Sequence, residues 1–436
     1  MRSFRTQLIA VLVVLTLVAT GCAIDAANAS SDNREANIEL TMTMLPGHGL
    51  QRLIDEWERE HPGVRVTLVE RPYDAHHEWL REQLDSDAAG GEVAAGDDHE
   101  SPDIAMIEVA YAAQFQSRSS GFVDLDAAFG ASELDDNYLD WRWQHGVSPD
   151  GQLFGIPTDL GGLAVAYRTD LFAEAGLPTD PGDVAELWPD WESFIEVGHR
   201  FVAESDMAFI DDAVSLYEVI LNQSTTQYYG DDGELIVADN PVVSEAWRVA
   251  LGAVESKIDS GFVAFSEEWN TAMANGSYAV LLAPAWMMSY IRQQAPATAG
   301  RWNITSIPGD GGNWGGSQLA IPASSDEPEL AWSLISFVLG ERGQLRTFLD
   351  WGNFPSIPAL FNDPALISSE PDFFSNAPVG RIYANSALEL RPTVLGEHQR
   401  QITIDLGDSL RLVRNGADPD QVWADAIDAI EELHRN

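Results

Sequence analysis

Four aromatic residues stand at breaks in the chain, where a strand is expected to end or a loop to begin. Trp286 follows Ala-Pro-Ala at the end of an apolar run, and Trp314 lies among four glycines in "GGNWGG". Trp351 precedes "GNFPSIP", and Tyr111 follows "PDIAMIEV". Ligands of α/β proteins meet the sheet at such strand ends and loops. Flat rings there suit sugars, whose C–H faces pack on aromatic surfaces.

Two carboxylates are placed to complete such a site. Glu108 ends the run "PDIAMIE", and Asp159 lies in "GIPTDL". Sugar hydroxyls need fixed polar partners, and a carboxylate accepts a hydroxyl hydrogen strongly because the bond is charge-assisted. The rings and acids together predict a carbohydrate-binding site. For Trp314 the alternative is a wedge between two domains that never touches ligand.

Other chemistries lack their signatures. The chain has no GxSxG, no phosphate-binding GxxxxGK[ST] and no HExxH. His76 and His77 are the only close histidine pair, and adjacent positions do not share a helix face, so we expect no metal site and no cofactor. A net charge of −45, from 24 basic and 69 acidic residues, argues against nucleic acid and anionic membrane surfaces as partners.

The N-terminus reads as an export signal. Two arginines precede an apolar stretch that is too short for an ordinary membrane span, and the stretch ends at Cys22, the only cysteine. "LVATGC" resembles the lipobox of bacterial lipoproteins, which predicts a signal peptide over 1–22 and lipidation of Cys22. The alternative is a plain secretory signal with a chance cysteine. Residues 23–37 are small and polar and predict a flexible tether.

The elements that must position the site follow from apolar periodicity. Residues 38–44 alternate as a strand, 50–60 place apolar residues on one helix face, and 64–69 alternate again. This order predicts a βαβ unit and a parallel sheet. Further strands are expected at 102–109 and 276–286, and a helix at 326–340. About 400 residues exceed what one core usually serves, so we expect two domains.

Five segments carry a family resemblance over nearly the whole chain after the tether. They are "IDEWEREHPGVRVTL", "PDIAMIEVAYAAQF" with "GFVDLD", "GIPTDLGGLAVAYRTDLFAEAGLP", "MANGSYAVLLAPAWMMSYI" and "NWGGSQLAIPASSDEPELAWSLISFV". Together they resemble the extracellular solute-binding proteins of carbohydrate ABC transporters, the maltose-binding-like group. The resemblance implies a class II two-lobe α/β fold with discontinuous lobes and a hinge that the chain crosses more than once.

The lobes implied by the resemblance are 38–157 with 279–317, and 158–278 with 318–436. Hinge crossings are expected near 157–162, 275–282 and 316–322. Closure of the lobes around a ligand would be a hinge motion.

The resemblance also implies roles for eight residues. Asp159 would accept a hydroxyl, Trp286 would be a stacking platform, and the loop Trp314–Ser317 would contact the ligand. The remaining candidates lie on the rim of the first lobe, at Glu108 and Tyr111, and in a loop of the second lobe, at Trp351 and Asn353.

The implied function is a lipid-anchored, extracytoplasmic and monomeric receptor. It would capture a sugar and deliver it, chemically unchanged, to the permease of an ABC importer. Several aromatic platforms favour an oligosaccharide over a monosaccharide. Two alternatives stay open. One is a binding protein for a polyol, glycerophosphodiester or polyamine; the other is a secreted glycoside hydrolase, which needs two carboxylates at a fixed separation.

Overall fold

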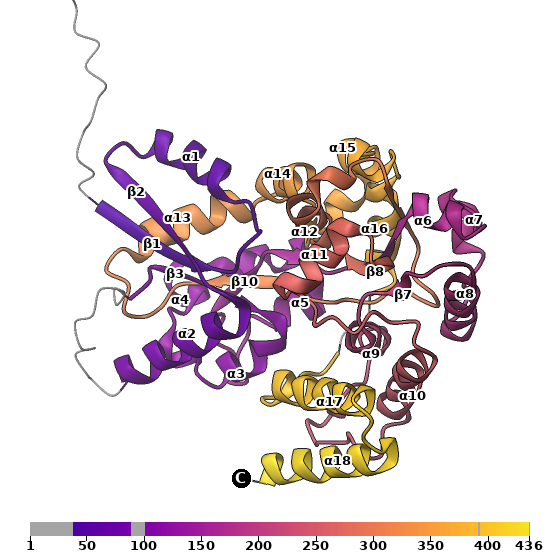
Figure 1. The fold of residues 1–436 in the computed structure, drawn as a ribbon. Coiled ribbons are helices and arrows are strands. Elements are labelled where there is room, and N and C mark those ends of the chain that lie inside the picture. Colours follow the sequence, from indigo (N-terminus) through magenta and orange to yellow (C-terminus); the bar gives the residue numbers. More distant parts are fainter. Residues whose placement is uncertain (1–37, 89–100, 391–392, 436) are drawn as a thin grey trace, which may run out of the picture.

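The computed structural model describes residues 38–88, 101–390 and 393–435. Cys22, the predicted signal peptide and the predicted tether lie outside the described residues. Within those residues the chain forms two main β-sheets, each covered by helices on both faces, and a small third sheet of two strands (Figure 1). Among the helices of the described residues, none combines the length and the apolar character needed to cross a membrane.

The first sheet has five strands in the order β2-β1-β3-β10-β4. As predicted, the first two strands are parallel and joined by a helix. β10 runs antiparallel to both of its neighbours. The strands are β1 (Ile38–Met44), β2 (Val64–Glu70), β3 (Ile104–Glu108), β4 (Gly155–Pro157) and β10 (Ser317–Ala320).

Helices cover both faces of this sheet, so its central strands are apolar on both sides. On β3, Ile104 and Met106 belong to the core beneath α1 (Gln51–Glu60) and α13 (Pro328–Leu339). The alternate residues Ala105 and Ile107 pack with α2 (Tyr73–Ala88) and α3 (Ala112–Gln116) on the other face (Figure 1). Because successive side chains of a strand point to opposite faces, β3 contributes residues to the apolar cores on both faces of the sheet.

The second sheet has four strands in the order β7-β8-β6-β9. β8 lies between β7, to which it is parallel, and β6, to which it is antiparallel. The strands are β6 (Leu163–Arg168), β7 (Ala208–Ile210), β8 (Tyr278–Pro284) and β9 (Trp302–Thr305).

Two sets of helices cover the second sheet. One face carries α8 (Trp191–Glu204), α9 (Ala213–Leu221), α10 (Pro241–Ser256), α17 (Gln399–Arg414) and α18 (Pro419–Arg435). The other carries α11 (Glu267–Asn275), α12 (Met287–Gln294) and α16 (Val379–Leu388). The core on this second face is continuous with the core beneath α1 and α13, so one apolar layer spans both sheets.

Three segments connect the sheets. The chain passes from β4 through β5 (Asp159–Leu160) into β6, and it returns between β9 and β10. The third passage follows α14 (Glu341–Trp351), where β11 (Phe354–Pro355) pairs with β5. The first passage coincides with the crossing expected near 157–162, whereas the return takes place over 306–316, before the expected 316–322, which contains β10 of the first sheet.

The predicted assignment of residues 279–317 to the first lobe is wrong. β8 and β9, the strands of that range before β10, pair with β6 in the second sheet, while β10 and α13 belong with the first. The predicted assignment of all of 318–436 to the second lobe is therefore wrong as well. No crossing occurs at 275–282, because β8 is bonded on both sides to second-sheet strands. Apolar alternation identifies a strand, but it does not identify the strand's neighbours.

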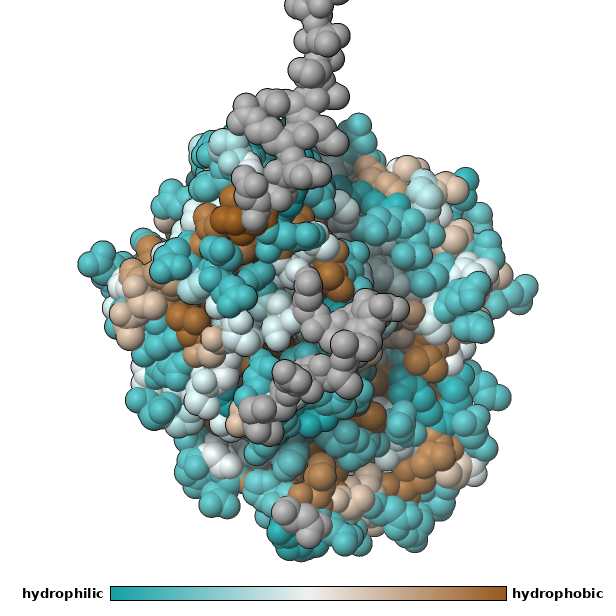
Figure 2. Space-filling model, turned by 90° about the vertical axis from the view of Figure 1, so that its left-hand side faces the viewer, coloured by the Kyte–Doolittle hydropathy of each residue, from teal (hydrophilic) through white to brown (hydrophobic). Residues whose placement is uncertain are grey.

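The surface agrees with the acidic composition. The face of the molecule shown in Figure 2 is mostly hydrophilic, with apolar side chains in small separate patches. Scattered apolar residues of this kind are normal for a protein surface.

Candidate functional site

The eight residues predicted for the site gather where the edges of the two sheets face each other. Register explains this: Ser317 lies opposite Glu108 in the first sheet, and Leu163 lies opposite Pro284 in the second. They form two groups with different surroundings. We call Glu108, Tyr111, Trp286 and Trp314 the edge group, and Asp159, Ser317, Trp351 and Asn353 the hinge group.

The two tryptophans of the edge group form a corner. Their ring centroids lie 6.1 Å apart at an interplanar angle of 69°, and Trp286 Nε1 donates to the carbonyl oxygen of Trp314 at 3.0 Å. Both side chains are partly exposed. Since the rings are neither fully buried nor stacked face to face, each leaves aromatic surface open.

Gly315 permits this arrangement. Its φ of +93° falls in the region that favours glycine, and a β-carbon there would lie 3.0 Å from Trp286 Nε1 and 3.6 Å from Glu108 Oε1. The glycines around Trp314 therefore let the backbone pass between a ring of the second lobe and a carboxylate of the first.

Glu108 presents one oxygen to the protein and leaves the other unengaged. Its Oε2 accepts hydrogen bonds from the Tyr73 hydroxyl and from the backbone N–H of Ala110, the latter at 2.7 Å. Within the described residues, Oε1 has no hydrogen-bond partner, although the residue is only 7% exposed. Burial raises the pKa of this carboxyl, while the bonds from Tyr73 and Ala110 oppose the rise.

Tyr111 is held by its neighbours on α2. Its ring stacks on His77 at a centroid distance of 3.9 Å, and its hydroxyl donates to Asp74 Oδ1 at 2.8 Å. Asp74 in turn receives two hydrogen bonds from Arg400 of α17, at 3.0 and 3.1 Å. Burial opposes ionisation of Asp74, but the hydrogen bonds and charge of Arg400 prevail and lower its pKa. This ion pair joins the helix layers of the two lobes.

The histidine pair supports the first-lobe edge. His77 donates from Nδ1 to the carbonyl oxygen of Tyr73 at 2.8 Å and accepts the backbone N–H of Glu108 at 3.0 Å. Burial lowers the pKa of His76 to about 4 and of His77 to about 3, so both rings are neutral at pH 7. Within residues 38–88, 101–390 and 393–435, no three His, Cys, Asp or Glu side chains are grouped to hold a metal ion.

The hinge group is occupied by partners within the protein. Asp159 is 3% exposed, and its Oδ1 accepts the Thr158 hydroxyl and the backbone N–H of Ser317, the latter at 3.1 Å. Arg142, which is fully buried, donates to the carbonyl oxygens of Asp159 and Ser317. Burial lowers the pKa of Arg142 to about 10, so it remains a cation at neutral pH.

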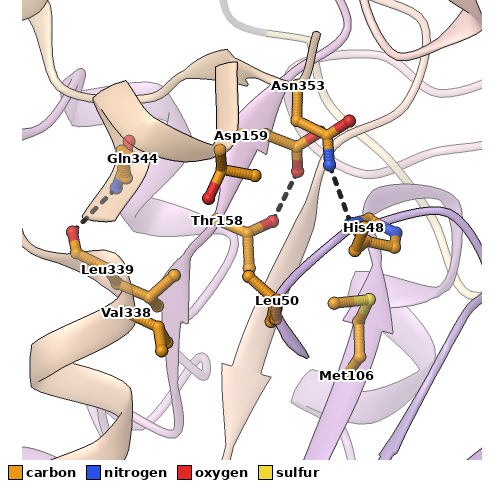
Figure 3. A pocket seen from close by; sticks show the side chains of 10 residues that line it. His48, Leu50, Met106, Thr158, Asp159, Val338, Leu339, Gln344 and Asn353 are labelled. Carbon is orange, nitrogen blue, oxygen red and sulfur yellow. Dashed lines mark hydrogen bonds between the residues drawn. The ribbon is translucent and has the colours of Figure 1, made fainter. Parts of the chain in front are cut away.

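The other half of the hinge group closes on the loop after β1. Asn353 contacts His48 with 3.3 Å between Nδ2 and Nδ1, and the Trp351 indole packs directly on Gly49. The cavity between these elements measures about 20 Å³, which is room for about one water molecule (Figure 3). Its lining includes His48, Asp159 and Asn353. A sugar does not fit there in this conformation.

Sequence reasoning missed several residues of the edge. Tyr73, Asp74 and Arg400 lie on helix surfaces and carry no motif. Phe265 lies in the loop between α10 and α11, and its ring centroid is 6.1 Å from that of Trp286. In the sequence, the only sign of Phe265 is an aromatic residue just before the polar residues of "VAFSEEW".

Comparison with known proteins places this fold in one class. The family described as "Bacterial extracellular solute-binding protein" matches residues 52–375, and the chain belongs to that family. A crystal structure of an extracellular solute-binding protein of family 1 is 31% identical, with a TM-score of 0.77, over 91% of this chain and 99% of that chain. The predicted two-lobe binding-protein fold is confirmed.

Named relatives are more distant in sequence. The arabinooligosaccharide-binding protein of Bacillus subtilis (strain 168) is 25% identical over 359 residues, which cover 78% of this chain and 77% of the relative. The lactose-binding protein of Rhizobium radiobacter is 27% identical over 264 residues, which cover 59% and 58%. The ABC transporter associated binding protein of B. animalis subsp. lactis Bl-04, solved with beta-1,6-galactobiose, has 21% identity and a TM-score of 0.75, over 91% and 97%.

Proposed function

We propose that this chain is the sugar-binding receptor of an ABC importer, and that it takes an oligosaccharide between the facing edges of its two sheets. The edge group carries the proposal. Trp286 and Trp314 form an aromatic corner, and beside it the buried Glu108 has an oxygen to which no other described residue donates a hydrogen bond. Rings that pack on sugar C–H faces and an acid that accepts hydroxyl hydrogens are the two things a sugar site requires.

The remaining parts of the proposal concern location and partners. Lipidated Cys22 would anchor a monomeric receptor outside the cytoplasmic membrane, and the tether over 23–37 would let it reach the permease subunits. Membership of an extracellular solute-binding family supports the location outside the cytoplasm, and the lipobox-like "LVATGC" is the support for the anchor.

A non-sugar solute is the competing candidate, and the charges of the edge disfavour one form of it. A glycerophosphodiester needs unpaired cations to bind its phosphate. Two arginine charges act on Glu108, those of Arg400 and Arg142. Arg400 already makes two hydrogen bonds to Asp74, and Arg142 is buried and donates to two backbone carbonyl oxygens. We also propose that the bound sugar is released unchanged, since the role of Glu108 is to hold a hydroxyl.

Titration calorimetry tests the proposal. The panel is lactose, beta-1,6-galactobiose and arabinotriose, against sorbitol, glycerophosphocholine and spermidine. We expect heat of binding from at least one sugar, and a gain of about 2.7 kcal/mol in apparent stability at a hundredfold excess over Kd. Chromatography after a day of incubation should show the sugar intact. Binding of only a non-sugar solute, or release of sugar products, would overturn the proposal.

A further inference from the structure

Phe265 combines two features that are rarely found together. Its side chain is 44% exposed, and its backbone φ is +68°, in the left-handed region. Three other described residues that are not glycine have a positive φ, namely Lys257, Ser375 and Asn376, and all three are polar. A bulky aromatic in this region is a backbone outlier, and such outliers persist where the surroundings fix them.

The loop that carries Phe265 is fixed at both ends. The Ser260 hydroxyl donates to the carbonyl oxygen of Asp211, at the end of β7, and accepts the N–H of Phe262 at 3.3 Å. Ser266 caps α11 by accepting the N–H of Trp269 at 3.1 Å. Trp269 Nε1 donates to Asp211 Oδ2 at 3.0 Å. These bonds hold Phe265 in its conformation without burying its ring.

The ring of Phe265 extends the edge group. Its centroid lies 6.1 Å from that of Trp286, and Trp286 lies the same distance, 6.1 Å, from Trp314. Tyr290 supports the ring edge-on at 5.4 Å, with its own hydroxyl bonded to Asn270. Three aromatic side chains from three different loops therefore make a row along the edge of the second sheet.

We propose that Phe265 forms an additional subsite, in which a further sugar residue of an oligosaccharide packs on its ring beside the residue held at Trp286. The proposal rests on the proposed function and deepens it, since it states that the ligand extends along the edge of the second sheet toward α11. The inner side of the ring packs on the buried Trp269 at 5.3 Å between centroids, but nearly half of the side chain still faces solvent. An exposed ring held in strained backbone is explained by a ligand that covers it.

A chain-length series tests the subsite. Calorimetry compares galactose, beta-1,6-galactobiose and galactotriose, and arabinose, arabinobiose and arabinotriose, on the wild type and on Phe265→Ala. We expect the variant to lose about tenfold in affinity for the longest sugar and less than about twofold for the shortest sugar that binds. An equal loss at every length, or no loss at any, would overturn the subsite while leaving sugar binding in place. If no sugar binds the wild type, both proposals fall.

Two further variants separate binding from folding. Val263→Ala removes another exposed apolar side chain, 49% exposed, from the same loop, and it should bind every sugar as the wild type does. Phe265→Gly removes the ring and also relieves the left-handed backbone, so its melting temperature should equal or exceed that of the wild type. A Phe265→Gly protein of full stability that keeps wild-type affinity for the longest sugar contradicts the proposal.

Discussion

The edge group and the hinge group contain the same kinds of residue, yet they occupy opposite environments. In each group carboxylate, hydroxyl or amide side chains accompany tryptophan near a strand end. In the hinge group Asp159 already accepts a backbone N–H and a hydroxyl, and Trp351 lies against Gly49. Both groups keep polar atoms without a partner in the described residues, Glu108 Oε1 in one and Asn353 Oδ1 in the other, but Asn353 lines a cavity of about 20 Å³ whereas Glu108 lies beside two partly exposed rings. Ligand-binding capacity depends on which unsatisfied groups the fold leaves accessible, and residue type alone does not reveal it.

The largest effect on ligand affinity is expected from Trp286→Ala. Loss of an aromatic platform that contacts the ligand should weaken sugar binding by about 100-fold. Trp332→Ala is the matched control, because Trp332 is also partly exposed but stacks on Phe129 at 5.3 Å, in the helix layer of the first lobe. Calorimetry on both variants measures the difference. Equal losses of sugar affinity in Trp286→Ala and Trp332→Ala would contradict a special role of the edge group in ligand binding.

Asp159→Ala should lower stability more than it lowers sugar affinity, the opposite of what is expected for Trp286→Ala. The change leaves the buried N–H of Ser317 with only its 3.2 Å bond to Thr158 Oγ1 and removes one acceptor of the Thr158 hydroxyl, so the free energy of unfolding should fall by about 1–2 kcal/mol. Asp159→Asn retains an acceptor oxygen and should lose less. Urea unfolding and calorimetry check the pair. If Asp159→Ala unfolds like the wild type and fails to bind sugar, Asp159 contacts ligand, as the family resemblance implied, and the hinge group is not structural.

A pH effect is expected from Asp211, which anchors the loop of Phe265. Burial and the charge of Asp212 raise the pKa of Asp211 to about 8, so the folded state binds a proton there that the unfolded state has released. The free energy of unfolding therefore falls as pH rises from about 4 to about 8, with a slope from this group of at most about 1.4 kcal/mol per pH unit. Asp211→Asn should flatten that slope in urea unfolding measured across this range. An unchanged slope would mean that Asp211 titrates normally.

The smallest effect is expected from Arg400→Gln. The ion pair with Asp74 joins α2 to α17 across the two lobes, but both side chains are partly exposed, at 26% and 47%. Such pairs contribute about 0–1 kcal/mol, so sugar affinity should fall by about two- to fivefold if the pair favours the closed form. Arg411→Gln is the control on the same helix, since Arg411 pairs with Asp212 inside the second lobe. Equal effects of the two variants would show that the pair across the lobes has no special role.

Several elements of the fold were predictable because their signal is local. The strand at 38–44, the helix that follows it and the strand from Val64 appear where the periodicity placed them, and Leu53, Ile54 and Trp57 are buried as expected. The neighbours of β8 and β9 were predicted wrongly, because pairing partners are set by long-range packing that no single strand encodes. The two-lobe fold was accessible only through the resemblance of several motifs together.

For the candidate site, the sequence by itself determined which residues stand at strand ends, and so it brought Glu108, Trp286 and Trp314 to one edge. Only the tertiary structure decided which polar atoms remain without partners. Asp159 and Glu108 are both buried acids after strands, and within the described residues each has one bonded and one unbonded carboxylate oxygen. Asp159, however, lines a cavity of about 20 Å³, while Glu108 lies beside the partly exposed Trp286 and Trp314. Phe265 emerged only from the fold, because its exposure and its left-handed backbone depend on bonds to Asp211, far away in the chain. Hydrogen-bond satisfaction is a property of residues distant in sequence and close in space, and for that reason the structure had to decide it.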